Sequence, residues 1–179
     1  MTEISQLEPG QIADQAMKAY HAKEFLEAAR LFDLAADGFS EIADPLNAAE
    51  MKNNQSVALL QAGNAMESFN VVQGTDKVFA EAGDHKRQAM ALANMGAALA
   101  DLKKNDDAIK SYEESSAILK ELGEKDLRAD IQRSLSVLRV KKREFTDAVM
   151  EMQEGMMGVE KPTLKQRILK KLLFMRLWK

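Results

Sequence analysis

The side chains best suited to chemistry are few in this chain and stand apart from one another. The 179 residues include two histidines, His21 and His85, and no cysteine. Neither histidine has a second histidine or a carboxylate at the spacing that metal ligands need to share one face. Both are therefore expected to be exposed surface residues. The lack of cysteine excludes disulfides and thiolate metal sites.

Adjacent carboxylates are the other candidates for catalysis. Asp106-Asp107 and Glu113-Glu114 lie in helical patterns close to Lys110. This arrangement indicates solvated helix faces with ion pairs between successive turns, and not a general acid and base. The sequence also has no phosphate-binding glycine loop and no nucleophile elbow. We expect no catalytic residue, no metal site and no cofactor, and hence no enzyme.

Charge is distributed unevenly along the chain. The net charge is −3, but residues 161–179 hold five lysines, two arginines and no acidic residue, so residues 1–160 carry −10 against +7. No secretory signal is recognisable, and no apolar run approaches the ~20 residues of a membrane span. We expect a cytoplasmic protein with a helical repeat domain over 1–160 and a basic, partly amphipathic helix over 161–179.

A shift of forty residues aligns the sequence with itself. Small residues recur at two positions and larger apolar residues recur at three. The first small set is Ala16, Ser56, Gly96 and Ser136, and the second is Ala28, Ser68, Ala108 and Ala148. The first apolar set is Phe32, Val72, Tyr112 and Met152, the second is Phe39, Phe79 and Leu119, and the third is Ile42, Ala82 and Leu122. Small residues let two helices cross closely, and large ones fill the layer between repeats. Such pairs must stack, because none buries its apolar face alone.

Turn-forming residues divide the repeats into helices, and no segment alternates with the period of a strand. The sequence predicts an all-α solenoid of four antiparallel pairs: 9–22 with 25–43, 45–62 with 65–82, 85–103 with 106–122, and 126–142 with 145–157. Gly83 is expected to cap the helix before it, and Asp44 and Asp84 the helices after them. A ninth helix is predicted over 163–178, with Thr163 as its N-cap.

This pattern resembles the tetratricopeptide repeat, which combines small residues in both helices with an aromatic residue in the second. The third repeat shows it best, with Gly96, Ala108, Tyr112 and Ser115. The period of forty exceeds the usual 34, and resembles the subgroup found in kinesin light chains and mitotic-spindle adaptors. The fourth repeat departs from the pattern, because Arg139 occupies a core position. The resemblance implies a right-handed superhelix; a HEAT-type repeat is the alternative of similar length.

In tetratricopeptide superhelices the first helix of each pair lines a concave groove, so the resemblance predicts a partner-binding groove here. Its predicted lining residues are Asp14, Met17, Tyr20, Asn53, Asn54, Val57, Gln61, Asn94, Ala97, Asp101, Arg133 and Lys141. The recurring Asn54 and Asn94 either hold a partner's backbone through donor and acceptor or bond to neighbouring helices. The expected function is a scaffold or adaptor that binds a peptide or helix of a partner protein.

The basic C-terminal helix is a second candidate contact surface. Its predicted contact residues are Leu164, Ile168, Lys170, Lys171, Leu172, Phe174, Arg176 and Trp178. Three roles stay open: a cap on the last repeat, a peripheral contact with an anionic membrane, or docking onto another copy of the chain. The alternative function is therefore a membrane-associated or self-assembling structural protein. No specific nucleic-acid binding is expected, because the body is acidic and no reading motif is present.

Overall fold

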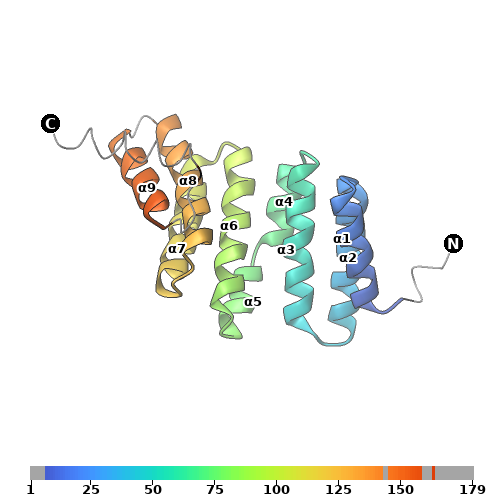
Figure 1. Ribbon diagram of the computed structural model, residues 1–179. Coiled ribbons are helices and arrows are strands. Elements are labelled where there is room, and N and C mark those ends of the chain that lie inside the picture. The colour runs from blue at the N-terminus through green and yellow to red at the C-terminus, as the bar shows by residue number, and fades with distance from the viewer. Residues whose placement is uncertain (1–6, 143–144, 159–162, 164–179) are drawn as a thin grey trace.

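The computed structural model describes residues 7–142, 145–158 and 163, and within these ranges the chain is helical without strands (Figure 1). Consecutive helices stack in chain order, with α1 and α9 at opposite ends. The helices are α1 (Pro9–His21), α2 (Phe25–Glu41), α3 (Pro45–Gln61), α4 (Ala65–Val72), α5 (Thr75–Glu81), α6 (His85–Asp101), α7 (Asn105–Glu121), α8 (Lys125–Lys141) and α9 (Phe145–Gly158). This confirms the predicted all-α solenoid. The helix predicted over 163–178 lies outside the described residues, apart from Thr163.

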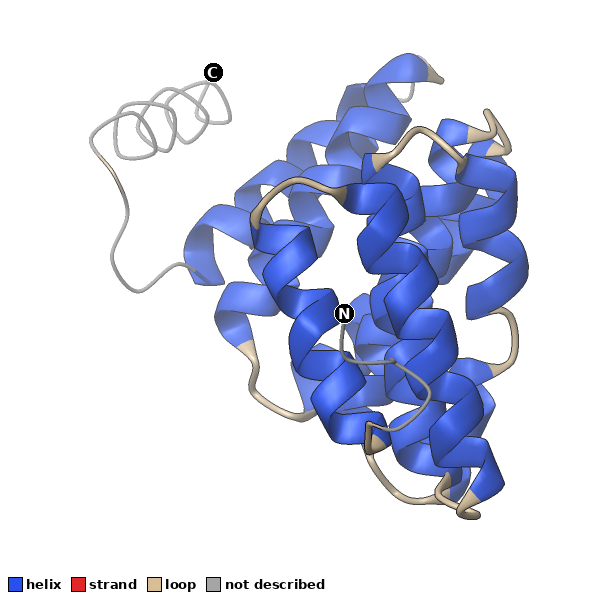
Figure 2. Ribbon diagram, turned by 90° about the vertical axis from the view of Figure 1, so that its right-hand side faces the viewer, coloured by secondary structure: helices blue, strands red, loops and turns tan. Residues whose placement is uncertain are grey.

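The chain reverses direction through turns of one geometry, and most connecting loops gather at the ends of the helices (Figure 2). The middle residue of each turn has a positive φ between +57° and +84°. The next residue donates its backbone N–H to a carbonyl five residues earlier, as Asp44 does to Phe39 and Asp84 does to Phe79, both at 2.9 Å. This closure satisfies the last carbonyls of the helix. The middle residues are Lys23, Ala43, Gly63, Gly83, Lys103 and Gly123, twenty residues apart.

Aspartate caps start two of the first helices, as predicted. Asp44 accepts the backbone N–H of Asn47 at 3.1 Å at the start of α3, and Pro45 occupies the first turn. Asp84 accepts the backbone N–H of Arg87 at 3.0 Å at the start of α6. That bond and the Arg87 guanidinium lower the pKa of Asp84. Each cap satisfies a backbone donor that has no partner within its own helix.

The small residues of the repeat lie buried where the helices of a pair cross, which confirms the predicted close packing. In the second pair, Ser56 Oγ and Ser68 Oγ are 2.9 Å apart and share a buried hydrogen bond. In the third pair, Gly96 faces Tyr112, and a Cβ added to Gly96 would lie 3.0 Å from the tyrosine Cδ1. The other buried members are Ala16, Ala28, Ala108 and Ser136. The side chain of Ala148 lies outside the described set.

The helix predicted as continuous over 65–82 is instead broken in two. Gly74 has φ +82° and separates α4 from α5. Thr75 is buried just after the break, and its hydroxyl donates to the Val72 carbonyl at 2.8 Å. The prediction failed because an isolated glycine is tolerated inside a helical pattern and does not by itself mark a break, whereas Gly74 here adopts a left-handed conformation.

The third predicted apolar set is also wrong as a core position. Ile42 and Leu122 are 61% and 44% exposed, and Ala82 is exposed as well. All three are the C-cap residues of their helices. The shared position therefore marks the turn between repeats, and the core lies one helical turn earlier, at Phe79 and Leu119.

The turn geometry predicts opposite effects for two matched substitutions. Ala43→Gly is expected to raise the free energy of unfolding by up to ~1 kcal/mol, because φ +57° strains an alanine. Gly83→Ala is expected to lower it by about 1 kcal/mol. A Cβ at Gly83 meets nothing within 4 Å, so the loss would come from the backbone alone. Urea unfolding followed by circular dichroism measures both.

Gly10→Ala is the control, because Gly10 lies inside α1 with the same open space around it. Alanine is favoured in a helix, so this variant is not expected to lose stability. A destabilised Ala43→Gly variant would contradict the assignment of strain to the turn.

Candidate functional site

Two hollows lie on the face formed by the first helices of the pairs, α1, α3, α6 and α8, which we call the first-helix face. One hollow, of about 110 Å³, lies among Met17, Tyr20, Phe32, Asn54 and Val57. The other, of about 260 Å³, has Ala100, Tyr112, Arg133, Ser134, Val137, Leu138 and Lys141 around it. Four residues of the first correspond to four of the second after a shift of eighty residues, which is two repeats. The hollows are therefore repeat-equivalent parts of one surface.

Second helices contribute an aromatic side chain to each hollow, and first helices supply the remaining residues. Phe32 of α2 and Tyr112 of α7 are both buried at these equivalent places. Burial raises the pKa of Tyr112, and a hydrogen bond with Ser134 acts in the opposite direction. The larger volume of the second hollow is consistent with Ala100 replacing the bulkier Tyr20.

Asn54 and Asn94 occupy equivalent positions on α3 and α6, and both are half-buried on the first-helix face. Within the described part of the chain, neither side chain forms a hydrogen bond. In the described residues, no neighbouring helix uses their donors and acceptors. Each amide offers two donors and one acceptor carbonyl to an arriving backbone.

Charged residues border this face at both ends. Asp14 and Asp101 are exposed on α1 and α6, and Arg133 and Lys141 are exposed on α8. The uncharged Gln61 is exposed on α3. Arg133 forms an ion pair with Asp130 at 2.9 Å. Ala97 is half-buried beside this row. The face is thus mainly apolar and amide-bearing in its middle and carries positive charge beside the second hollow.

The structure places Asn53 away from the first-helix face, which corrects its inclusion among the groove residues. Asn53 is 7% exposed, and its Oδ1 accepts a hydrogen bond from Thr75 at 3.3 Å. Successive helix residues are rotated by about 100°, so Asn53 points to α5 although the adjacent Asn54 reaches the surface. Sequence reasoning also missed the role of Phe32 and Tyr112, which it assigned to the core alone.

The histidines show no arrangement for chemistry in the described residues. His21 is exposed, and His85 Nδ1 lies 3.0 Å from Gln88 Oε1 of the same helix. Among the described residues, no group of three or more histidine, aspartate and glutamate side chains is placed to hold a metal ion. No described helix is long and apolar enough to cross a membrane.

Comparison with known families places this chain. The family described as soluble NSF attachment protein, SNAP, matches residues 8–175. The chain belongs to the SNAP family. The match covers all described helices and continues past residue 160 into the basic segment.

Among solved structures, this SNAP-family chain is similar to the crystal structure of BtubC (BKLC) from P. vanneervenii. The TM-score is 0.74 at 18% identity, over 94% of this chain and 69% of that chain, so the similarity concerns the fold alone. No curated protein sequence is significantly similar. These findings establish a helical repeat protein, while the more specific tetratricopeptide resemblance stays a prediction.

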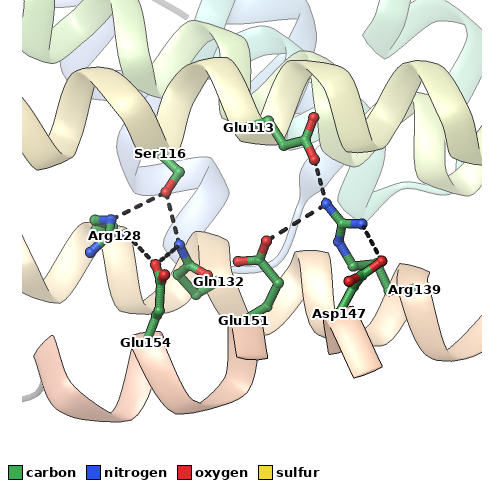
Figure 3. A network of polar contacts seen from close by, with 8 residues as sticks. All are labelled: Glu113, Ser116, Arg128, Gln132, Arg139, Asp147, Glu151 and Glu154. Carbon is green, nitrogen blue, oxygen red and sulfur yellow. Dashed lines mark hydrogen bonds and ion pairs between the residues drawn. The ribbon is translucent and has the colours of Figure 1, made fainter. Parts of the chain in front are cut away.

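The last pair of the SNAP-family chain is joined to α7 by polar contacts (Figure 3). Arg139 of α8 contacts Glu113 of α7 and two residues of α9, Asp147 at 3.5 Å and Glu151 at 3.7 Å. Its side chain is only 15% exposed. The arginine that broke the repeat pattern in the sequence therefore links three helices through carboxylates, which explains why a charged residue is tolerated there.

A second group of contacts joins the same three helices, about one turn further along α7 and α9 and nearer the start of α8 (Figure 3). Gln132 Nε2 is 3.1 Å from Ser116 Oγ and 3.3 Å from Glu154 Oε2. Arg128 pairs with Glu154 and lies 3.3 Å from Ser116 Oγ. In both groups the acidic side chains of α9 point to α8 and contact its arginines, Arg128 and Arg139.

The acidic surroundings of Arg139 predict a pH-dependent stability. Burial raises the pKa of Glu151, against the opposing attraction of Arg139. Between the ordinary and the raised pKa, the folded state binds more protons than the unfolded state, so stability falls as pH rises through that interval. Glu151→Gln cannot titrate and is expected to remove this fall. Urea unfolding at a series of pH values measures the difference.

Glu114→Gln on the exposed side of α7 is the matched control and should follow the wild-type pH profile. A Glu151→Gln variant whose pH profile equals that of the control would show that Glu151 keeps its ordinary pKa.

Proposed function

We propose that this chain is a protein-interaction adaptor that binds an apolar peptide or helix of a partner across the first-helix face. SNAP-family proteins bind protein partners, and membership of the family supports the adaptor role. The observation that carries the proposal is the pair of repeat-equivalent hollows, at Phe32 and at Tyr112. The proposal assigns binding and no catalysis.

The chemistry of the face specifies the kind of partner. Its hollows accept apolar side chains, and burial of such side chains drives most protein association. Asn54 and Asn94 lie at equivalent positions of the second and third repeats and can hold polar groups of the partner's backbone. Lys141 beside the larger hollow favours a carboxylate next to the inserted side chain. The proposed ligand is thus an extended or helical segment with spaced apolar residues and an acidic flank.

The basic segment supports a second proposal. Residues 161–179 carry +7 and include Phe174 and Trp178, which suit an anionic membrane surface. In that case the protein is cytoplasmic and binds the membrane surface peripherally, without spanning it. Co-sedimentation of the full chain with phosphatidylserine vesicles tests this, and a chain that stays in the supernatant would exclude it.

The adaptor proposal is tested with two matched variants of the full chain. Val137 in the second hollow is 51% exposed, and Met66 on α4 is 53% exposed. Val137→Asp is expected to weaken capture of the partner at least about tenfold. Changing a residue that anchors a binding site reduces the binding free energy by roughly 1–3 kcal/mol or more. Met66→Asp changes the same kind of exposed residue elsewhere and should leave capture unchanged. Pull-down from the native source with quantitative mass spectrometry measures both.

Asn54→Ala with Asn94→Ala forms the second arm of this test. We expect weaker capture of the same partner without a change in thermal stability, since neither side chain bonds within the described structure. Equal capture by the wild type, Val137→Asp and the asparagine variant would exclude the first-helix face as the binding site.

A further inference from the structure

We propose that the α1–α2 end of the solenoid is a docking site for the basic segment, residues 161–179, of a second copy of this chain. The hollow at this end shares no lining residue with the hollows of the first-helix face, so the proposal does not rest on the adaptor function. The contact would join unlike surfaces, the α1–α2 end of one copy and the basic segment of another.

A hollow of about 490 Å³ opens at this end, within the ~300–1,000 Å³ that binding pockets usually have. Leu7, Ile12, Leu34 and Ile42 contribute apolar surface to it. Leu34 and Ile42 are 38% and 61% exposed. Both side chains lie at the mouth of the hollow, so its apolar surface is accessible to a partner.

An acidic row runs along α2 beside this hollow. Asp33, Asp37 and Glu41 are spaced four residues apart and therefore lie on one side of the helix. All three are exposed, and none of them forms a salt bridge within the described residues. The arginine of this helix, Arg30, is already bound to Glu27 through contacts of 2.6 and 2.8 Å. Like charges in such a row repel one another, and a cationic partner would remove that cost.

The basic segment has the complementary chemistry. It holds seven cations and no acid, and Leu164, Ile168 and Leu172 follow a helical spacing. Lys170 and Lys171 would meet the acidic row of α2 while the apolar side chains enter the hollow. Complementary charge of this kind sets partner choice and orientation.

The segment must come from another copy. Residues 159–162 span at most about 14 Å when fully extended. The α1–α2 end lies across the stack from α9 (Figure 1), and each helix layer adds about 8–10 Å. If residues 163–178 form the predicted helix, its first turn therefore lies too far from the α1–α2 end for Leu164 to enter the hollow of its own chain.

Other surfaces of the chain match the segment less well. The described carboxylates of α9 are already in contact with arginines of α8, Glu154 with Arg128 and both Asp147 and Glu151 with Arg139. The second hollow of the first-helix face has the exposed Lys141 beside it, which would repel a basic segment. The α1–α2 end thus combines a hollow with exposed apolar residues and a row of carboxylates that form no salt bridge within the described residues.

Charge exchange between the two surfaces tests the proposal in the full chain. Sedimentation velocity over a range of concentrations is expected to show reversible self-association that weakens with salt. Asp37→Lys with Glu41→Lys, and separately Lys170→Glu with Lys171→Glu, should each weaken self-association at least about tenfold. One chain that carries all four substitutions should associate again, because the charges are complementary once more.

Glu114→Lys with Glu121→Lys is the control, with the same change of charge on exposed residues of α7, and should associate like the wild type. Circular dichroism confirms that every variant is folded. The proposal would be overturned by a wild type that stays monomeric. It would also be overturned if the Asp37→Lys with Glu41→Lys variant associated like the wild type, or if the chain with four substitutions did not regain self-association. A monomer that binds phosphatidylserine vesicles through Lys170 and Lys171 would assign the segment to a membrane. A monomer destabilised by Leu172→Asp would assign it to its own last pair.

Discussion

Close crossing of two helices at a pair of small side chains is the constraint on which the rest of the structure depends. Where Ala16 or Ser56 stands in a first helix, a small residue stands opposite in the second, and the two backbones approach closely. That approach leaves the larger residues, such as Phe32 and Tyr112, to fill the layer towards the next pair. The stack follows because no pair buries this layer alone.

The hollows of the first-helix face are a consequence of the same packing. A large aromatic residue of a second helix lies beneath the gap between two successive first helices, and the side chains around the gap decide how much space remains. Ala100 leaves more space than Tyr20 at the equivalent position. Repetition therefore produces equivalent sites, and differences at a few positions give each its own size and charge.

The first and the last helix pair of the described stack differ in how their charged residues are arranged. At the last pair, Arg128 and Arg139 hold α9 through carboxylates, so polar contacts replace part of the apolar layer. At the first pair, α2 keeps exposed apolar residues beside an acidic row. The acidic side chains of the last pair thus contact arginines of the same chain, whereas the acidic row of α2 forms no salt bridge within the described residues and can pair with a cationic partner.

Much of this arrangement followed from the sequence. The forty-residue period located the helix pairs and the small crossing residues, because local propensity and packing agree at these positions. Caps at Asp44 and Asp84 were also predictable, since a short acceptor before a helix satisfies a backbone donor locally. These features depend on residues near in sequence.

Only the tertiary structure decided which polar side chains form hydrogen bonds or ion pairs within the molecule. Asn53 accepts a hydrogen bond from Thr75, whereas its neighbour Asn54 forms none within the described residues. Arg139 forms ion pairs with carboxylates from two other helices. The break at Gly74 likewise depends on Thr75 being buried against α3. Such contacts depend on residues that are far apart in the chain and meet through packing. A repeat period predicts on which face of a helix a residue lies, but it does not predict which residue of another helix it contacts.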